Sequence, residues 1–480
     1  MRKWLALFVL FCGFMLGVEG TVTLSPEGPA YEVISSMTIG TTVQPTIANS
    51  GTSAGFLLLC ADGNDNLNTV FFDNNTQMWG SLVQTAPSTT NLTRGPVVLS
   101  NSPSVAVATW LGNTVGFNSG YAYAGFTSNN GTSWQILPLE SVDGGVPLVG
   151  VSGSSDGYMF VWFDYQQSTA PFWLWSTFNG TDWVVSSSGT IPAPSGINNP
   201  ANVSGTMSTG FMAAWIGSDN NVYASYTGNE GGTWSTPQQL STSGIVRYSW
   251  IAGNANGFML VWSDGANNLY STFYDLSSQM WQASPLLITT GAAIGSIPGP
   301  YVTGSDIGFV LSWLDTNNNA NGSISADNGT NWSPAVLITD DGSVSGTSGN
   351  LGDYIGASIV GETVLFTWAD ASGNAQSRFY TIQGVITTPD PPASITGSQF
   401  SNNFPFQREL VNTLRWTSSP SLGVVSYNIY RNGSLISSVS ASGSLVYTDR
   451  PIKKGTGYTY GVTAVNINQQ ESSAATVFVK

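Results

Sequence analysis

Short apolar segments recur along this chain at an interval of roughly fifty residues. In each unit an apolar segment, usually opened by glycine and closed by an aromatic residue, precedes a segment in which apolar and polar residues alternate. A tight polar turn and a final segment headed by tryptophan usually complete the unit, and seven units follow one another. The clearest apolar segments are residues 157–162, 210–215, 257–262 and 308–313, and Trp110, Trp368 and Cys60 occupy the aromatic position in three other units.

Four short strands per unit, repeated in series, are typical of the blades of a β-propeller. The pattern therefore predicts an all-β fold with a seven-bladed β-propeller over residues 21–386. Six or eight blades remain open if a degenerate unit has been miscounted. The seventh unit begins near Ile355 and lacks a fourth strand, whereas residues 30–38 precede the first unit and have no unit of their own. We expect this N-terminal segment to supply the missing outer strand and so close the ring.

A second domain is predicted after the repeats. Residues 387–393 are rich in proline and are expected to form a semi-rigid linker. Residues 394–480 are expected to form an immunoglobulin-like β-sandwich, and they resemble a fibronectin type III domain over their whole length. Trp416 matches the core tryptophan of that family, and Tyr458 stands where the family has its tyrosine-corner residue. The resemblance implies a fold but no ligand.

Composition agrees with an exported β protein. Aromatic residues make up 12% of the chain and charged residues only 8%, which suits half-buried pleated surfaces. Residues 1–20 combine a basic start with a short apolar run and are interpreted as a secretory signal peptide, with an uncleaved anchor as the alternative. No later segment is long and apolar enough to cross a bilayer. We therefore predict a secreted or surface-exposed protein, in which Cys60 would be the single remaining cysteine.

Charge excludes several classes of function. The formal net charge is −15, and no lysine occurs between Lys3 and Lys453. Nucleic-acid binding requires cations that displace phosphate counterions, so this class is rejected. The chain contains no histidine, which excludes histidine-dependent triads, histidine metal sites and histidine acid–base catalysis.

The polar turns before the fourth strands resemble the Asp-box (BNR-type repeat) of sialidase-like propellers. Aspartate stands at the box position in one of the three best copies and asparagine in the other two. In that family the boxes lie on the face away from the ligand, so we interpret these residues as structural. Residues 176–183 are a weaker copy, and residues 72–79 and 274–281 keep only the tryptophan. The residues concerned are Asn129, Gly131, Trp134, Asn229, Gly231, Trp234, Asp327, Gly329 and Trp332.

Sialidase activity, by the same resemblance, would require three arginines that bind a carboxylate. The predicted propeller contains Arg94, Arg247 and Arg378. Arg94 and Arg247 share one position, at the start of an inner strand, which propellers usually present to the ligand. Arg378 lies instead within the third strand of the last unit. We favour hydrogen bonding of these arginines to loop carbonyls over a catalytic role.

A carboxylate recurs two positions after the aromatic position in five units. Such residues can supply a glycosidase pair, with carboxyl groups about 5–9.5 Å apart, or oxygen ligands for calcium. The alternative is that each aspartate caps its own turn, and the recurrence favours this, because a catalytic pair is normally unique. The five residues are Asp62, Asp164, Asp264, Asp315 and Asp370.

Aromatic residues after a longer turn are candidates for stacking on sugar rings. Phe172, Trp173 and Trp175 form this group, although packing between blades is the interpretation we favour. Together these features predict a non-catalytic recognition or adhesion protein whose propeller binds a glycan or an extracellular protein. A sialidase-like glycoside hydrolase and a structural envelope component remain alternatives. No cofactor is expected, and calcium remains open.

Overall fold

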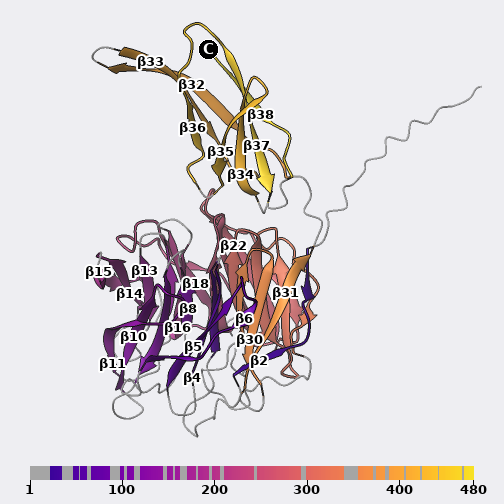
Figure 1. The fold of residues 1–480 in the computed structure, drawn as a ribbon. Coiled ribbons are helices and arrows are strands. Elements are labelled where there is room, and N and C mark those ends of the chain that lie inside the picture. The colour runs from indigo at the N-terminus through magenta and orange to yellow at the C-terminus, as the bar shows by residue number, and fades with distance from the viewer. Residues whose placement is uncertain are drawn as a thin grey trace, which may run out of the picture.

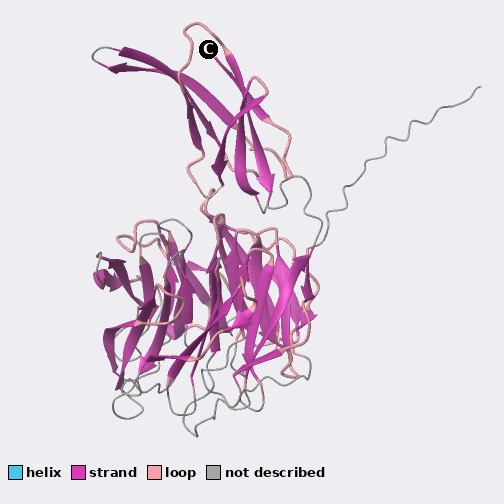
Figure 2. Cartoon of the chain, viewed as in Figure 1, coloured by secondary structure: helices cyan, strands magenta, loops and turns pink. Residues whose placement is uncertain are grey.

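Strands and turns make up the described part of the protein. The structure is a computed structural model, and none of its described residues forms a helix (Figure 2). It describes residues 22–34, 47–52, 54–61, 66–86, 98–101, 105–112, 119–143, 149–154, 157–162, 170–179, 182–193, 197–205, 210–242, 246–292, 299–339, 355–370, 374–383, 389–404, 407–421, 424–441, 443–466 and 470–480.

Seven small antiparallel sheets form the seven blades of a β-propeller (Figure 1). The first blade contains β3 (Ile47–Thr52), β4 (Gly55–Ala61), β5 (Leu67–Asp73) and β6 (Met78–Trp79), and β7 (Val83–Ala86) also pairs with β5. The second blade contains β8 (Val98–Asn101), β9 (Ala106–Gly112), β10 (Ser119–Thr127) and β11 (Gln135–Asp143). The third blade contains β12 (Gly150–Gly153), β13 (Tyr158–Trp162), β14 (Phe172–Phe178) and β15 (Trp183–Thr190). The fourth blade contains β16 (Ile197–Gly205), β17 (Phe211–Gly217), β18 (Val222–Thr227) and β19 (Gln238–Gln239). The fifth blade contains β20 (Val246–Gly253), β21 (Gly257–Asp264), β22 (Asn268–Asp275) and β23 (Met280–Trp281), and β24 (Leu286–Thr290) also pairs with β22. The sixth blade contains β25 (Tyr301–Ser305), β26 (Gly308–Leu314), β27 (Ala320–Ser325) and β28 (Val336–Leu337).

The N-terminal strands complete the seventh blade, as expected from the unmatched first segment. This blade contains β29 (Gly356–Val360), β30 (Thr363–Ala369) and β31 (Ala375–Gln383). Both β1 (Thr23–Pro26) and β2 (Tyr31–Ile34) pair with β31, so the closure uses two short strands where the sequence predicted one. Each inner strand contacts the inner strand of the next blade, and β29 contacts β3, which closes a ring of seven.

Close packing of the inner strands explains why glycine ends several of them. A Cβ atom at Gly253 would lie 2.3 Å from the carbonyl oxygen of Gly205, and one at Gly304 would lie 2.4 Å from that of Gly253. Any side chain at these positions would push neighbouring blades apart. The ring therefore depends on glycine where the strands approach most closely.

The second strands are mostly apolar because both of their faces are covered by neighbouring blades. Every residue of β17 and of β21 is buried. Aromatic residues fill the space between blades, and Trp183 of the third blade stacks on Phe126 of the second with ring centroids 4.8 Å apart. The tryptophans that recur in the sequence are therefore mainly core residues.

Residues after 394 form the immunoglobulin-like β-sandwich expected from the sequence. One sheet contains β32 (Ile395–Phe404), β33 (Gln407–Trp416) and β36 (Val446–Asp449). The other contains β35 (Ser434–Ser440), β34 (Val424–Arg431), β37 (Tyr458–Asn466) and β38 (Ala475–Val479). Trp416 is buried against Tyr427 in its core, as predicted for the core tryptophan.

Candidate functional site

The recurrent aspartates lie at one end of the propeller. Consecutive antiparallel strands reverse direction, so all turns between second and third strands share one end of the blades. We call this end the aspartate face and define it by the described residues Asp264, Asp315 and Asp370 and by Asp219, which the sequence analysis did not identify and which lies in the corresponding turn of the fourth blade. The turns between third and fourth strands lie on the opposite face.

Each described aspartate of the predicted set caps its own turn. Asp264 accepts hydrogen bonds through Oδ1 from the backbone N–H groups of Ala266 (2.8 Å) and Asn268 (3.0 Å), and through Oδ2 from Nδ2 of Asn268 (2.9 Å). Asp315 repeats all three bonds one blade further on. Asp370 accepts two bonds from Asn374 and one from Gln376. The capping interpretation is therefore confirmed for these three residues.

Other predicted members of this face stay predictions. Asp62, Asp164 and Arg94 lie outside the described residues, and the backbone of Arg247 lies near the start of β20 while its side chain is not described. No group of three or more Asp, Glu, Cys or His side chains in the described ranges is arranged to hold a metal ion.

These turns hold their carboxylates in the ionised form. Burial by itself would raise the pKa of Asp264, but the hydrogen bonds from Asn268 and Ala266 outweigh it and lower the pKa below its ordinary value. The pKa of Asp315 is lowered by the same balance of burial against bonds from Asn319 and Asn317. Neither residue has the raised pKa that a glycosidase acid requires.

We expect the stability of the propeller to fall on acidification and to change little at neutral pH. The folded pKa values of Asp264 and Asp315 lie below their unfolded values of about 3.9, so their contribution is complete above that pH and is lost as the pH falls through the folded values. No histidine titrates between pH 5 and 8. Urea unfolding between pH 2 and 8 measures this, and the double variant Asp264→Asn/Asp315→Asn should lose part of the acid dependence. An unchanged dependence in that variant would contradict the assignment.

Stacked aromatic pairs lie just below the aspartate face. The ring centroids of Trp215 and Tyr223 lie 6.2 Å apart, and those of Trp262 and Tyr270 lie 5.7 Å apart. Both tryptophans are buried. The aromatic position of the repeat therefore supplies a rigid floor beneath the turns and is not itself exposed to a ligand.

The two tryptophans of the group proposed for sugar stacking are buried instead. Trp173 is 7% exposed and Trp175 is 2% exposed, whereas Phe172 is half-buried and stacks on Trp162 of its own blade with centroids 5.9 Å apart. Trp173 packs against Trp234 of the next blade. The assignment of Trp173 and Trp175 as ligand-face residues is wrong, because contacts between blades cover them, as the alternative interpretation expected.

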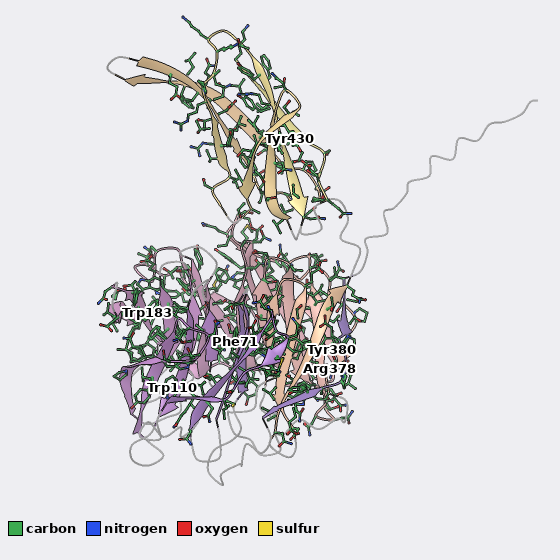
Figure 3. All side chains as sticks on the ribbon, in the orientation of Figure 1. Phe71, Trp110, Trp183, Arg378, Tyr380 and Tyr430 are labelled. Atoms are coloured by element: carbon green, nitrogen blue, oxygen red, sulfur yellow. The ribbon has the colours of Figure 1, made fainter. Side chains whose placement is uncertain are left out.

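Arg378 has a structural role, as favoured from the sequence. Its Nε donates to the carbonyl oxygen of Gly28 (2.9 Å) and its Nη1 to that of Ile338 (3.1 Å). Figure 3 shows Arg378 beside Tyr380, which is also on β31. The guanidinium carbon of Arg378 lies 5.5 Å from the centroid of the Tyr380 ring. This arginine therefore ties the closing N-terminal segment to the sixth and seventh blades.

The turns on the opposite face fasten each blade to the one before it. Asp327 accepts hydrogen bonds from Ser325 Oγ (2.9 Å) and from the backbone N–H of Asn331 (2.8 Å). Asn129 and Asn229 accept the corresponding bonds in their own turns. Trp332 donates to Ser271 of the preceding blade (3.1 Å). These bonds support a structural role for the turn residues.

The glycines of these turns also pack against the preceding blade. A Cβ atom at Gly231 would lie 2.5 Å from the ring of Trp173, and one at Gly329 would lie 2.5 Å from Met259. Thr69 donates to the carbonyl oxygen of Gly131 (3.2 Å), while Trp134 lies against the core cluster of the first two blades and Trp234 against Trp173. In each case the contact reaches the preceding blade.

We expect Asp327→Ala to destabilise the propeller by about 1–2 kcal/mol, because two turn N–H and O–H groups lose their acceptor. Asp327→Asn should cost less than about 0.5 kcal/mol, because asparagine already makes the same bonds at two equivalent positions. Chemical denaturation of both variants measures the difference. Equal losses would show that the charge, and not the acceptor oxygen, matters.

Two turns that the sequence treated as keeping only their tryptophan have an aspartate of their own. Asp73 accepts a bond from the backbone N–H of Asn75 (2.8 Å), and Asp275 accepts one from that of Ser277 (2.7 Å). The earlier description of residues 72–79 and 274–281 is therefore incomplete. Comparing the two segments with each other, both of which contain Gln-Met-Trp, would have identified this second type of turn.

Asparagines on the aspartate face escaped the sequence interpretation. Asn220, Asn267 and Asn318 occupy one position of the turn with φ of 60°, 67° and 62°, which asparagine tolerates. The carbonyl oxygen of Asn267 accepts bonds from Gly291 and Ala292, on the segment that leads to the next blade. Asn317 in the same turn as Asn318 is exposed. Neutral amides therefore decorate this face between the capped carboxylates.

Comparisons with known proteins found similar solved structures but no family. No family model matches the chain, and no curated protein matches it. Among solved structures, AofleA from Arthrobotrys oligospora shares 11% identity, with 66% of this chain and 92% of that chain covered and a TM-score of 0.44. A mutant of the Aleuria aurantia lectin in complex with Fucalpha1-6GlcNAc shares 12% identity, with 62% and 96% covered and a TM-score of 0.40.

An enzyme also appears among the similar structures. The alpha-L-arabinofuranosidase ARB93A from Fusarium graminearum, in complex with an iminosugar inhibitor, shares 10% identity, with 74% of this chain and 98% of that chain covered and a TM-score of 0.43. Similarity at this level does not identify a ligand for this chain. Within the described residues, no helix is long and apolar enough to span a membrane.

Proposed function

We propose that this chain is a secreted or surface-exposed recognition protein whose propeller binds a glycan on the aspartate face without cleaving it. The strongest support comes from the polar groups of this face, because its carboxylates are already hydrogen-bonded and its amides are neutral. The carboxylates of Asp264, Asp315 and Asp370 are already bound by their own turns, while neutral amides stand between them over a rigid aromatic floor. Amides can both donate to and accept from sugar hydroxyls.

A glycoside hydrolase on this face fits less well. Hydrolysis would require one carboxylic acid with a raised pKa beside a second carboxylate. The lowered pKa values of Asp264 and Asp315 favour carboxylates that stay ionised as turn caps. The repetition of one arrangement in successive blades also favours repeated binding subsites over a single catalytic centre.

The architecture of the rest of the chain fits this role. We propose that the turns of Asn129, Asn229 and Asp327 are Asp-boxes of the sialidase-like type and that residues 394–480 are a fibronectin type III domain. The bonds within these turns support the first assignment, and the three- and four-stranded sheets with a buried Trp416 support the second. Tyr458, the predicted tyrosine-corner residue, is half-buried under Arg431. The type III domain would act as a spacer or a second contact.

A glycan-array screen with residues 21–480 tests the proposal, and each captured glycan is analysed for cleavage. We expect binding without cleavage, reduced at least tenfold by Asn317→Ala combined with Asn267→Gly, where glycine keeps the left-handed backbone. Asn130→Gly, at a left-handed position on the opposite face, is the matched control. Cleavage would replace the proposal by the hydrolase, and silence on the array would direct the search to protein partners.

A further inference from the structure

Positive charge is concentrated in the C-terminal part of the chain. Residues 394–480 contain seven of the 12 Lys and Arg residues but only three of the 27 Asp and Glu residues, a net charge of +4. Residues 1–393 therefore carry a net charge of −19. An asymmetry of this kind indicates that the basic part has a separate, acidic partner.

One end of the sandwich gathers four of these cations. Arg450, Lys453 and Lys454 lie in the connection between β36 and β37, and their side chains are exposed. Lys480 is exposed as well and follows Val479, which pairs with Tyr458 at the start of β37. The four residues therefore share one end of the sandwich, which we call the basic end.

The cations of the basic end are held in place and are not neutralised by the chain itself. The backbone N–H of Ile452, which is buried, donates to the carbonyl oxygen of Leu410 (3.0 Å) and fixes the connection. The nearby Asp449 is only 4% exposed and is bound by Arg431 and Tyr460. Among the described side chains, no carboxylate forms an ion pair with Arg450, Lys453, Lys454 or Lys480.

An exposed aromatic side chain lies beside these cations. Phe478 is 62% exposed, and its ring lies against Gly457, where a Cβ atom would approach it to 2.2 Å. An exposed phenylalanine next to several lysines is the combination that peripheral proteins use on anionic lipid, where the ring enters the headgroup region and the cations meet phosphates. The cluster of cations and the exposed phenylalanine are independent observations, and both favour an anionic lipid surface as the partner.

We propose that the basic end binds an anionic lipid surface, with Phe478 inserted among the headgroups and Arg450, Lys453, Lys454 and Lys480 on the lipid phosphates. A second copy of the chain fits less well, because the described carboxylates of the aspartate face already accept bonds from their own turns. Repulsion between the acidic propeller and the lipid would keep the propeller away from the surface and free for its own ligand. This inference does not depend on glycan binding.

Sedimentation of the full chain with phospholipid vesicles tests the inference. We expect binding to vesicles with about a third phosphatidylserine, none to neutral phosphatidylcholine vesicles, and a steep loss of binding with added salt. Lys453→Gln combined with Lys454→Gln should lower the partition coefficient about 25-fold, since each cation near the surface contributes about fivefold. Phe478→Ser should lower it about tenfold.

Two control variants separate the site from general effects of charge and hydrophobicity. Arg415→Gln removes an exposed cation near the other end of the sandwich, and Phe178→Ser removes an exposed phenylalanine of the propeller. Both should bind vesicles like the unmodified chain. Equal losses in the controls would overturn the inference, as would the absence of binding to anionic vesicles. Binding to soluble dextran sulfate alone would overturn it in favour of an anionic polysaccharide, and salt-sensitive self-association without lipid would overturn it in favour of a second copy.

Discussion

Removing residues 22–34 is expected to open the propeller and to cost about 4 kcal/mol or more of its unfolding free energy. Both β1 and β2 pair with β31, and Leu24 is buried in the core cluster with Tyr380 and Ile382. The deletion would expose the edge of β31 and these apolar side chains. Thermal unfolding and size-exclusion chromatography of residues 35–480 against residues 22–480 measure the effect, and we expect aggregation or a much lower midpoint.

A peptide of residues 22–34 provides the matched control for this deletion. Added to the shortened chain, it should restore part of the lost stability by pairing with β31, whereas a peptide of the same composition in scrambled order should not. An unchanged midpoint in the shortened chain would show that the seventh blade is stable without its outer strands. Contacts between the inner strands would then be sufficient to close the propeller.

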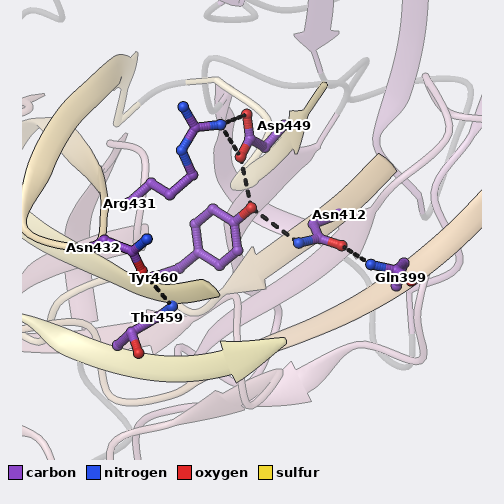
Figure 4. A network of polar contacts seen from close by, with 7 residues as sticks. All are labelled: Gln399, Asn412, Arg431, Asn432, Asp449, Thr459 and Tyr460. Carbon is purple, nitrogen blue, oxygen red and sulfur yellow. Dashed lines mark hydrogen bonds and ion pairs between the residues drawn. The ribbon is translucent and has the colours of Figure 1, made fainter. Parts of the chain in front are cut away.

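Asp449→Ala is expected to destabilise the sandwich by about 2–4 kcal/mol, because it leaves the buried hydroxyl of Tyr460 and the partly exposed guanidinium of Arg431 without their acceptor. Figure 4 shows the network: Asp449 accepts hydrogen bonds from Tyr460 (2.6 Å) and from Nη1 of Arg431 (3.0 Å), and Asn412 donates to the hydroxyl of Tyr460 (3.0 Å). Burial and the bond to Asp449 raise the pKa of Tyr460 far above its ordinary value, so its hydroxyl stays protonated. Urea unfolding monitored by tryptophan fluorescence measures the loss.

Conservative variants distinguish this network from simple burial. Asp449→Asn keeps one acceptor oxygen and should lose less stability than Asp449→Ala, and Tyr460→Phe should lose about 1–2 kcal/mol. Asp390→Ala, at an exposed aspartate, should change stability by less than about 0.5 kcal/mol. A loss in Asp449→Ala no greater than in Asp390→Ala would contradict the proposed contribution of the network.

The sequence predicted the architecture well because its signals are local. The repeat, the mostly apolar second strands and the tryptophan near the start of six fourth strands are visible without knowing any distant contact. Even the closure by the N-terminal segment followed from counting strands, since the last unit lacked the one that the start of the chain offered. The division of that closure between β1 and β2 could not be read from the sequence, because no hydrophobic pattern marks the break at Gly28.

The candidate site was harder to predict, because the availability of a side chain depends on its neighbours in space. Trp173 and Trp175 follow a long turn and suggested exposed rings, yet the adjacent blade covers them. The asparagines at positions 267 and 318 were overlooked, because their backbone conformation shows only in the turn. Asp264, Asp315 and Asp370 were placed correctly in these turns, and the repetition of the aspartate already favoured the capping role.

By itself, the sequence determined an all-β chain with seven repeated units and a second β domain, because strand periodicity and turn chemistry are properties of neighbouring residues. The tertiary structure alone decided which polar groups remain available. Asp264 and Asp315 are bound within their turns, while Arg450, Lys453, Lys454 and Lys480 come together only because β37 and β38 pair at that end of the sandwich. Residues distant in sequence become one surface through strand pairing, and no local pattern encodes that proximity.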